Sequence, residues 1–328
     1  MSLPVEVTDD WCEIVLTRDG TDETETAWKA ARRQGISGSD ALAAMGLDPR
    51  KQRAHLWREK VEETEQAENE AMVAGRFLEP AVKALFTWHT SLEVIDSDTL
   101  LRSVAHPWML ATPDGYVYDE AGTLGLFEAK TTTVYLADEW ADEQVPERAA
   151  AQTMHYLAVT GLPFAYVAVL INNRLQWRYI ERDERLIRRI VELEEEFWQT
   201  VVDREMPPIV YGKDTDELLR ELYPESDGTQ IEASDETAQL VENWRSCSEQ
   251  EAHWRTRAKE TGQLVRAAMG DAERLVYGDR TLATWKTQDH RELDRDALKE
   301  AHPDIYAQFS VNKPRRVLRH VKPKRGTE

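Results

Sequence analysis

The fold is decided by residues 110–133, which read LATPDGYVYDEAGTLGLFEAKTTT. Two runs in this stretch are rich in Val, Thr and aromatic residues, and a Gly-containing turn separates them. Such runs are typical of strands, so we expect one strand over 108–118 and a second over 123–133.

Three polar side chains stand out in these strands. Asp114 is expected inside the first strand, and Glu128 and Lys130 on the second. Because residues i and i+2 of a strand share a face, Glu128 and Lys130 project together. If the two strands pair as a hairpin, Asp114 lies beside Glu128 at the same end of the sheet.

Two adjacent carboxylates repel each other and lose solvation unless a cation joins them. A hard divalent cation, Mg²⁺ or Mn²⁺, does so, and Mg²⁺ needs only one or two carboxylates besides water and a substrate phosphate. Such an ion activates water toward a phosphate, and the Lys130 ammonium can hold that water. The ordinary alternative is a buried Glu128–Lys130 ion pair with Asp114 as the turn residue of Pro-Asp-Gly. The combined arrangement favours phosphodiester hydrolysis.

The periodicity of apolar residues around this stretch predicts helices, then strands, then helices. We expect Ser39 or Asp40 to cap a short helix, Pro80 to break or kink a longer one, and the three middle strands to form an antiparallel meander. The expected helices are 27–33, 41–45, 54–61, 71–89, 146–159, 183–202, 233–269 and 293–308. The expected strands are 92–103, 108–118 and 123–133, followed by hairpins over 164–180 and 274–287.

This order predicts an α/β (α+β) fold with a mixed β-sheet core flanked by helices, followed by a C-terminal helical arm and a small hairpin. We expect Trp57, Trp88, Trp140, Trp177 and Trp198 to lie in the core. The expected domains are an N-terminal arm over 1–26, a nuclease core over 27–210, an acidic helical segment over 211–275, and a hairpin, helix and basic tail over 276–328.

The composition limits the function. The 328 residues hold 41 Lys and Arg against 61 Asp and Glu, a net charge of −20, which by itself counts against a nucleic-acid enzyme unless one groove is basic. Two cysteines exclude a disulfide framework and a four-thiolate iron–sulfur cluster, and hence a Cas4-like nuclease. Without a long apolar run or the basic-then-apolar order of a signal peptide, we expect no membrane partner and a cytoplasmic location, in the host cell if the gene is phage-encoded.

Five short motifs make the chain resemble a known family, the YqaJ-like viral recombinase nucleases, which are related to phage lambda exonuclease and belong to the PD-(D/E)XK class. The resemblance covers about residues 30–205 and implies a restriction-endonuclease-like core. The motifs are Gly35-Ile36-Ser37-Gly38-Ser39-Asp40, Gly75-Arg76-Phe77-Leu78-Glu79-Pro80, Ala111-Thr112-Pro113-Asp114-Gly115 after His106-Pro107, Glu128-Ala129-Lys130-Thr131, and 152–161.

The resemblance implies roles at the matching positions. Asp114, Glu128 and the Ala129 carbonyl look like metal ligands, and Lys130 looks like the catalytic lysine. Three further residues have ordinary alternatives, which stay open. Glu79 either resembles a helix-borne carboxylate of the same site or is an ordinary charge near the helix terminus. Gln152 either resembles a glutamine that lines the site or is an exposed helix residue. Ser39 either resembles a phosphate-binding hydroxyl or is an ordinary N-cap.

Arginines suit phosphate binding, so Arg32, Arg33 and Arg76 are candidates for gripping a terminal phosphate. His155 is expected to be packed rather than catalytic. The basic tail over 312–325 either contacts the DNA backbone or keeps the terminus soluble.

The resulting prediction is a Mg²⁺-dependent DNA exonuclease that shortens double-stranded ends, with 5′-to-3′ polarity, a trimeric ring and a single-strand annealing protein as partner implied by the resemblance alone. One alternative is a structure-specific endonuclease of the same superfamily. The others are a catalytically inert DNA-binding or assembly protein, and a purely structural protein built on the helices at 183–202 and 233–269.

Overall fold

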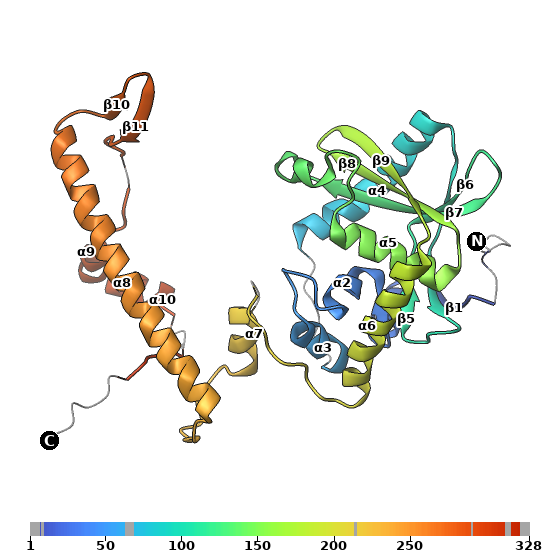
Figure 1. Ribbon diagram of the computed structural model, residues 1–328, viewed down its shortest axis with the longest axis horizontal. Helices are drawn as coiled ribbons and strands as arrows, with labels where there is room; N and C mark the ends of the chain where they lie inside the picture. Colours follow the sequence, from blue (N-terminus) through green and yellow to red (C-terminus); the bar gives the residue numbers. More distant parts are fainter. Residues whose placement is uncertain are drawn as a thin grey trace. The chain divides into compact units, whose positions relative to one another are not determined.

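The computed structural model describes Val7 and residues 10–62, 69–212, 215–289, 291–311 and 316–321. The chain divides into two compact units, residues 1–220 and 221–328, and each is taken by itself (Figure 1). In the described residues, no helix is long and apolar enough to cross a membrane.

The first unit contains two sheets. Its larger sheet has the order β3-β6-β7-β8-β9, in which β7 and β8 run parallel and the other neighbours antiparallel. The smaller sheet has the order β1-β4-β5-β2. The large-sheet strands are β3 Val94–Asp96, β6 Gly115–Tyr118, β7 Leu124–Thr132, β8 Phe164–Ile171 and β9 Arg174–Glu181, and the small-sheet strands are β1 Cys12–Thr17, β2 Ile36–Ser37, β4 Thr99–Ser103 and β5 Met109–Ala111.

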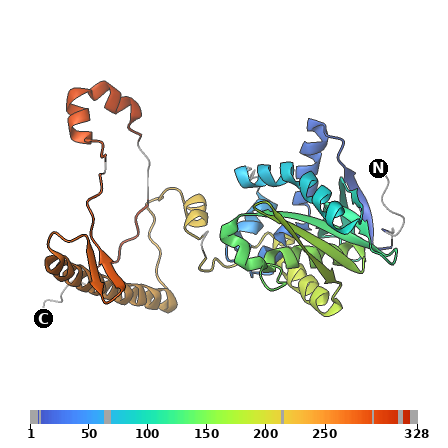
Figure 2. The same cartoon turned by 90° about the horizontal axis from the view of Figure 1, so that it is seen from above.

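Helices pack on both faces of these sheets, so the predicted α/β class with mixed sheets flanked by helices is confirmed (Figures 1 and 2). The predicted helix positions hold to within a few residues, except that α1 begins earlier. The helices of this unit are α1 Asp22–Arg33, η1 Gly38–Asp40, α2 Ala41–Ala44, α3 Arg53–Val61, α4 Glu70–Thr90, η2 Val134–Trp140, α5 Glu147–Thr160, α6 Glu184–Val202 and α7 Thr215–Leu222.

The predicted antiparallel meander is present as β3-β6-β7, but its first two strands are each broken and shared with the small sheet. The expected strand over 92–103 is two strands, β3 and β4, in different sheets, and the expected strand over 108–118 is likewise β5 and β6. Asp114 therefore lies in the break between β5 and β6 rather than inside a strand. The physical reason is that Pro113 lacks an amide hydrogen and cannot continue a sheet ladder. Both halves keep the predicted antiparallel pairing, β3 with β6 and β4 with β5, and β6 pairs with β7.

Two other local expectations also differ from the structure. Helix α4 is continuous through Pro80, so the expected break is absent. Trp88 near its end is 75% exposed, whereas the other tryptophans expected in the core are buried or partly buried.

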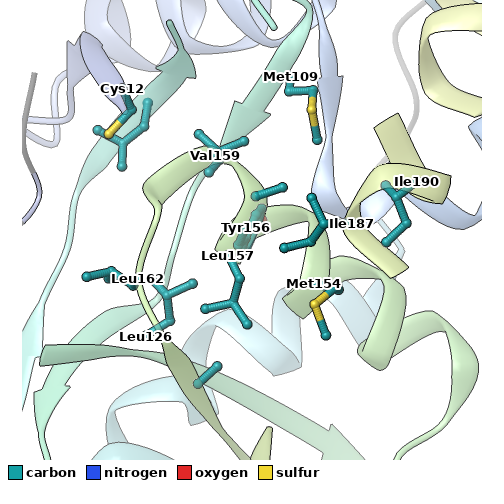
Figure 3. Close-up of a cluster of buried hydrophobic side chains, with 14 of the residues drawn as sticks. Cys12, Met109, Leu126, Met154, Tyr156, Leu157, Val159, Leu162, Ile187 and Ile190 are labelled. Carbon is teal, nitrogen blue, oxygen red and sulfur yellow. The ribbon is translucent and has the colours of Figure 1, made fainter. Parts of the chain in front are cut away.

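The main core lies around α5, which contacts both sheets (Figure 3). Leu126 of β7 and Leu157 of α5 are buried there. The opposite face of the large sheet is covered by α4, where Phe86 packs on Phe127 with ring centroids 4.9 Å apart. Alternation along β7 thus turns Phe127 toward α4 and Leu126 toward α5, which also places Glu128 and Lys130 on the α5 face.

Inside the core, α5 and α6 are joined by a buried pair, as expected for a packed His155. The Nδ1 atom of His155 lies 2.8 Å from the Glu194 carboxylate, and its Nε2 atom donates to the Leu110 carbonyl at 3.0 Å. Both side chains are fully buried. Burial lowers the pKa of His155, but the Glu194 charge and the two acceptors outweigh it, so that pKa is raised.

The second unit consists of a 35-residue helix, a hairpin and two short helices. It matches the predicted helical segment, hairpin and terminal helix, although the last is split in two. Its elements are α8 Asp235–Met269, β10 Arg274–Tyr277, β11 Arg280–Thr284, α9 Arg295–Ala301 and α10 Pro303–Phe309. Of the basic tail, Arg316 and Arg319 are described, whereas Lys313, Arg315, Lys322, Lys324 and Arg325 lie outside the described residues.

Candidate active site

The chain leaves the small sheet after β5 and enters the large sheet at β6, and Asp114, just before β6, lies beside the middle of β7. Gly115 pairs with Phe127 in the antiparallel register, so Asp114 extends one residue further, next to Glu128. The Asp114 carboxylate accepts a hydrogen bond from the Ala129 amide at 2.7 Å. The predicted proximity of the two acids is therefore present, although the local structure around Asp114 differs from the prediction.

Glu128 and Lys130 meet Gln152 of α5 on the inner face of β7. The Lys130 ammonium donates to Glu128 Oε1 at 2.6 Å and to Gln152 Oε1 at 3.0 Å. The Gln152 amide in turn donates to Glu128 Oε1 at 2.6 Å. The three side chains thus form a closed triangle of hydrogen bonds, and Gln152 is a member of this group rather than an exposed helix residue.

Tyr156 also belongs to this group; it lies inside the 152–161 motif, but no role was predicted for it. Its hydroxyl lies 3.3 Å from the Gln152 amide and 3.0 Å from the hydroxyl of Thr112. Burial and the nearby Glu128 charge raise its pKa to about 12, so the phenol stays protonated. The spacing could have revealed it, because Tyr156 lies four residues after Gln152 and hence on the same helix face.

Glu79 enters the site from α4 together with a lysine that was also missed. Lys83, one turn further along α4, lies 2.7 Å from Glu79 and 2.8 Å from Asp96 of β3. The Glu79 charge acts on both Asp114 and Glu128, raising their pKa values after the larger effect of burial. The carboxylates of Glu79, Asp114 and Glu128, which come from three different elements, are therefore close enough for their charges to interact.

Burial and mutual repulsion set the charges of the centre. Burial, followed by the Glu128 charge, raises the pKa of Asp114 well above its ordinary value. Burial also raises the pKa of Glu128. Burial lowers the pKa of Lys130, but the neighbouring carboxylates outweigh it, so that pKa is raised and the ammonium stays charged. Because ionising both Asp114 and Glu128 costs free energy in this buried setting, a bound cation would stabilise the site.

The residues fit a hard divalent cation. Glu128 is 3% exposed, and its Oε2 atom is buried without a hydrogen-bond partner in the described structure. Within the described residues, no three His, Cys, Asp or Glu side chains are already clustered as ligands. Each of the three carboxylates instead interacts with a donor of the chain: Asp114 with the Ala129 amide, Glu128 with Lys130 and Glu79 with Lys83. Two carboxylates and a main-chain carbonyl match Mg²⁺, which fills its remaining positions with water and phosphate.

A second polar group adjoins this centre. The Arg32 guanidinium donates to the hydroxyls of Ser37 and Ser39 at 3.0 and 3.1 Å. The N-cap of α2 is Asp40, one of the two predicted candidates, so Ser39 is not its cap. The cap before η1 is Ser37, whose hydroxyl donates to Asp40 at 2.9 Å. Although burial opposes it, the charges of Lys60, Lys51 and Arg32 lower the pKa of Asp40, so its carboxylate holds the group together.

Gly38 brings the two groups into contact. A Cβ atom there would lie 2.4 Å from the Tyr156 ring and 2.9 Å from Gln152 Cγ. The Arg32 and Ser39 group therefore sits directly beside the Gln152 side of the catalytic group. Arg148, one turn before Gln152 on α5, reaches the Ser39 carbonyl at 3.4 Å and was not predicted.

We expect Gly38→Ala to separate these groups. The added methyl must displace the buried Tyr156 ring, at a cost of about 1–3 kcal/mol. The melting temperature and any cleavage rate should both fall. The matched control is Gly262→Ala on α8, where a Cβ meets nothing within 4 Å and a helix gains propensity. A Gly38→Ala protein as stable and active as the control would contradict this packing.

The two remaining predicted phosphate contacts lie outside this group. Arg33 follows Arg32 on α1 and is partly exposed, and it is Arg32 that bonds the serine hydroxyls. Arg76 is exposed on α4, three residues before Glu79. Arg32 and Ser39, both predicted to meet phosphate, are thus in direct contact, whereas Arg76 lies on a different helix, α4.

The chain is similar to known proteins in sequence and in structure. A family model described as the YqaJ-like viral recombinase domain matches residues 27–163. The uncharacterized protein YqaJ of Bacillus subtilis (strain 168) is 32% identical over 286 residues, covering 85% of this chain and 88% of that protein. Among solved structures, the chain is similar to an alkaline exonuclease (LHK-Exo) from Laribacter hongkongensis, at 23% identity and a TM-score of 0.48 over 60% of this chain and 97% of that one. A phage related exonuclease from Haemophilus somnus 129PT is 12% identical, with a TM-score of 0.38 over 54% and 99% of the two chains.

The match to the Bacillus subtilis relative extends over most of both chains, and the family model matches the stretch that holds the acidic centre and the Arg32 group. This relationship supports a role in recombination. The chain therefore belongs to the YqaJ-like viral recombinase family.

Proposed function

We propose that this protein is a metal-dependent deoxyribonuclease that hydrolyses phosphodiester bonds at double-stranded DNA ends during phage-type recombination. The observation that carries the proposal is the convergence of Asp114, Glu128, Lys130 and Gln152 from the β5–β6 break, β7 and α5. An ion pair that only stabilised the fold would not need the nearby Asp114 and Glu79 carboxylates, which raise the cost of ionising Glu128.

The roles of the chain's residues follow from their chemistry. Asp114, Glu128, the Ala129 carbonyl and Glu79 would hold Mg²⁺ or Mn²⁺, which when bound polarises the scissile phosphate and acidifies a water molecule. Lys130 stays charged and donates hydrogen bonds, so it can orient the attacking water and offset the negative charge that develops on the phosphate. Gln152 fixes the Lys130 and Glu128 side chains, and Tyr156 fixes Gln152.

The Arg32 and Ser39 group would bind a terminal phosphate. A guanidinium and a hydroxyl suit a phosphate dianion, and the group adjoins the catalytic residues through Gly38. A phosphate held there would position the first phosphodiester of a 5′ end at the metal centre, which would give 5′-to-3′ polarity. Arg33 and Arg76 are further candidates for contact with phosphates. We further propose cytoplasmic action, a ring-shaped homotrimer and a single-strand annealing protein as partner, all of which rest on the family resemblance.

The test compares a linear duplex labelled at each 5′ or 3′ end with a relaxed circle of the same sequence, with Mg²⁺ or with EDTA. We expect Mg²⁺-dependent loss of the 5′ label from linear DNA first, faster with a 5′-phosphate than with a 5′-hydroxyl, and an intact circle. Cutting of the circle would instead support the structure-specific endonuclease. Binding without any cutting in Mg²⁺ or Mn²⁺ would support the inert DNA-binding protein and contradict the proposal.

A further inference from the structure

The charges of the chain are unevenly distributed. Residues 253–325 hold 17 Lys and Arg against 10 Asp and Glu, although the whole chain holds 41 against 61. A basic segment in an otherwise acidic protein is the usual electrostatic mark of a surface that meets phosphates. This segment lies entirely in the second unit and is separate from the acidic centre described above.

The same unit exposes large aromatic side chains. Trp254 on α8 is 67% exposed, Tyr277 at the end of β10 is 81% exposed, and Trp285 just after β11 is 48% exposed. Among the described residues of this unit, only Met269 is buried. These rings are therefore not the core of the unit, and their faces are accessible.

Two of these rings share a face with an arginine. Tyr277 and Arg280 are directly opposite in the β10–β11 register, so both side chains lie on one face of the hairpin. Trp254 and Arg257 are three residues apart on α8 and hence are neighbours on the helix surface. Neither arginine forms an ion pair with any other residue in the described part of the chain. The hairpin follows the C-terminal end of α8 and lies close to it in both views (Figures 1 and 2).

We propose that Trp254, Tyr277 and Trp285, with Arg257 and Arg280, form a binding surface for single-stranded DNA, in which bases stack on the rings and the arginines contact phosphates. Exposed aromatics interleaved with cations are the usual means of binding single strands without sequence preference. The surface would hold the unpaired strand that end resection leaves. The inference rests on the proposed function for the choice of DNA as ligand.

A protein partner or a second copy of the chain fits these residues less well. The centres of protein interfaces are depleted in charged residues, whereas here two exposed rings each lie beside an arginine that has no acidic partner among the described residues. The excess of Lys and Arg in residues 253–325 suits a polyanion such as DNA. Burying unpaired arginines in an apolar contact with another copy of the chain would be costly.

The test measures binding of fluorescein-labelled oligo(dT), 30 nucleotides long, by anisotropy in EDTA. The full-length protein carries Lys130→Ala, so that no cleavage occurs. We expect Trp254→Ala and Tyr277→Ala each to weaken binding by roughly tenfold, within the range for one lost stacking contact. Arg257→Ala combined with Arg280→Ala should lower the slope of log affinity against log salt by about 1.4, since each phosphate contact on a single strand contributes about 0.7.

The matched controls are Trp88→Ala, which removes an equally exposed tryptophan from the first unit, and Arg174→Ala, which removes an exposed arginine there. Both should bind oligo(dT) like the parent protein. Light scattering should give the same mass for every variant. Failure of the parent to bind, unchanged binding by a Trp254→Ala/Tyr277→Ala protein, or a loss of mass in that protein would each overturn the inference, the last in favour of a second copy.

This experiment separates the two proposals. A protein that binds oligo(dT) as expected, but whose native form cuts no DNA in Mg²⁺, would keep the binding surface and reject the nuclease. A protein that shortens linear duplexes, but whose oligo(dT) affinity does not depend on these residues, would keep the nuclease and reject the binding surface.

Discussion

Lys130→Ala should abolish cleavage of linear DNA and leave DNA binding in EDTA unchanged. The Lys130 ammonium is the only cation of the described chain that bonds both Glu128 and Gln152. Removing one preorganised donor from such a centre slows the chemical step by roughly 10²–10³-fold. The effect should therefore fall on kcat rather than on KM, and single-turnover cleavage of an end-labelled duplex would measure it.

The variant must be shown to be folded, because Glu128 loses its counter-ion. Lys130→Met keeps most of the side-chain volume and should show the same loss of cleavage with a smaller loss of stability. Arg174→Ala, which removes an exposed arginine of β9, is the matched control and should cut normally. A folded Lys130→Ala protein that cuts at close to the wild-type rate would mean that the hydrolytic mechanism is wrong.

The largest loss of stability is expected from Glu194→Ala. The Glu194 carboxylate is fully buried against His155, and its removal leaves the imidazolium in the core without its counter-ion. Breaking a buried ion pair by removing one member typically costs about 3–5 kcal/mol. Urea unfolding at pH 6 would measure the change. Glu195→Gln, which alters the exposed neighbour on α6, should change stability by no more than about 0.5 kcal/mol.

The pH dependence of the free energy of unfolding shows whether charged His155 stabilises the fold. Because folding raises the pKa of His155, its stabilisation is fully present below the ordinary histidine pKa of about 6.5 and is lost as the pH rises through the raised value. The difference in unfolding free energy between wild type and Glu194→Gln should therefore be larger at pH 6 than at pH 9. A difference that is the same at both pH values would show that His155 is neutral in the folded protein.

The sequence predicts the chemistry of the site better than it predicts the sheets around it. Glu128 and Lys130 follow from strand alternation alone, since β7 is nine residues long and has a clear pattern. Helix α5 is also predictable, because Pro146 precedes its first turn and Gly161, with a φ of 73°, ends it. In both cases the signal is local and repeated over several residues.

The rest depends on contacts between distant segments. Strands β3 and β5 have only three residues each, too few for periodicity to show that the chain changes sheet between β3 and β4 or between β5 and β6. The positions of Tyr156, Lys83 and Arg148 depend on how α4 and α5 pack on the sheet. The distinction between Arg32, which meets Ser39, and Arg33, which does not, depends on the rotation of α1 about its axis, which two adjacent arginines do not reveal.

We expect Asp114 and Glu128 to share one divalent cation. An anomalous difference map from a crystal of this protein grown or soaked with Mn²⁺, which replaces Mg²⁺ at oxygen sites, would locate that ion. One strong peak should lie about 2.1 Å from a carboxylate oxygen of each residue and from the Ala129 carbonyl. A map with Mn²⁺ bound elsewhere and no peak between Asp114 and Glu128 would contradict it.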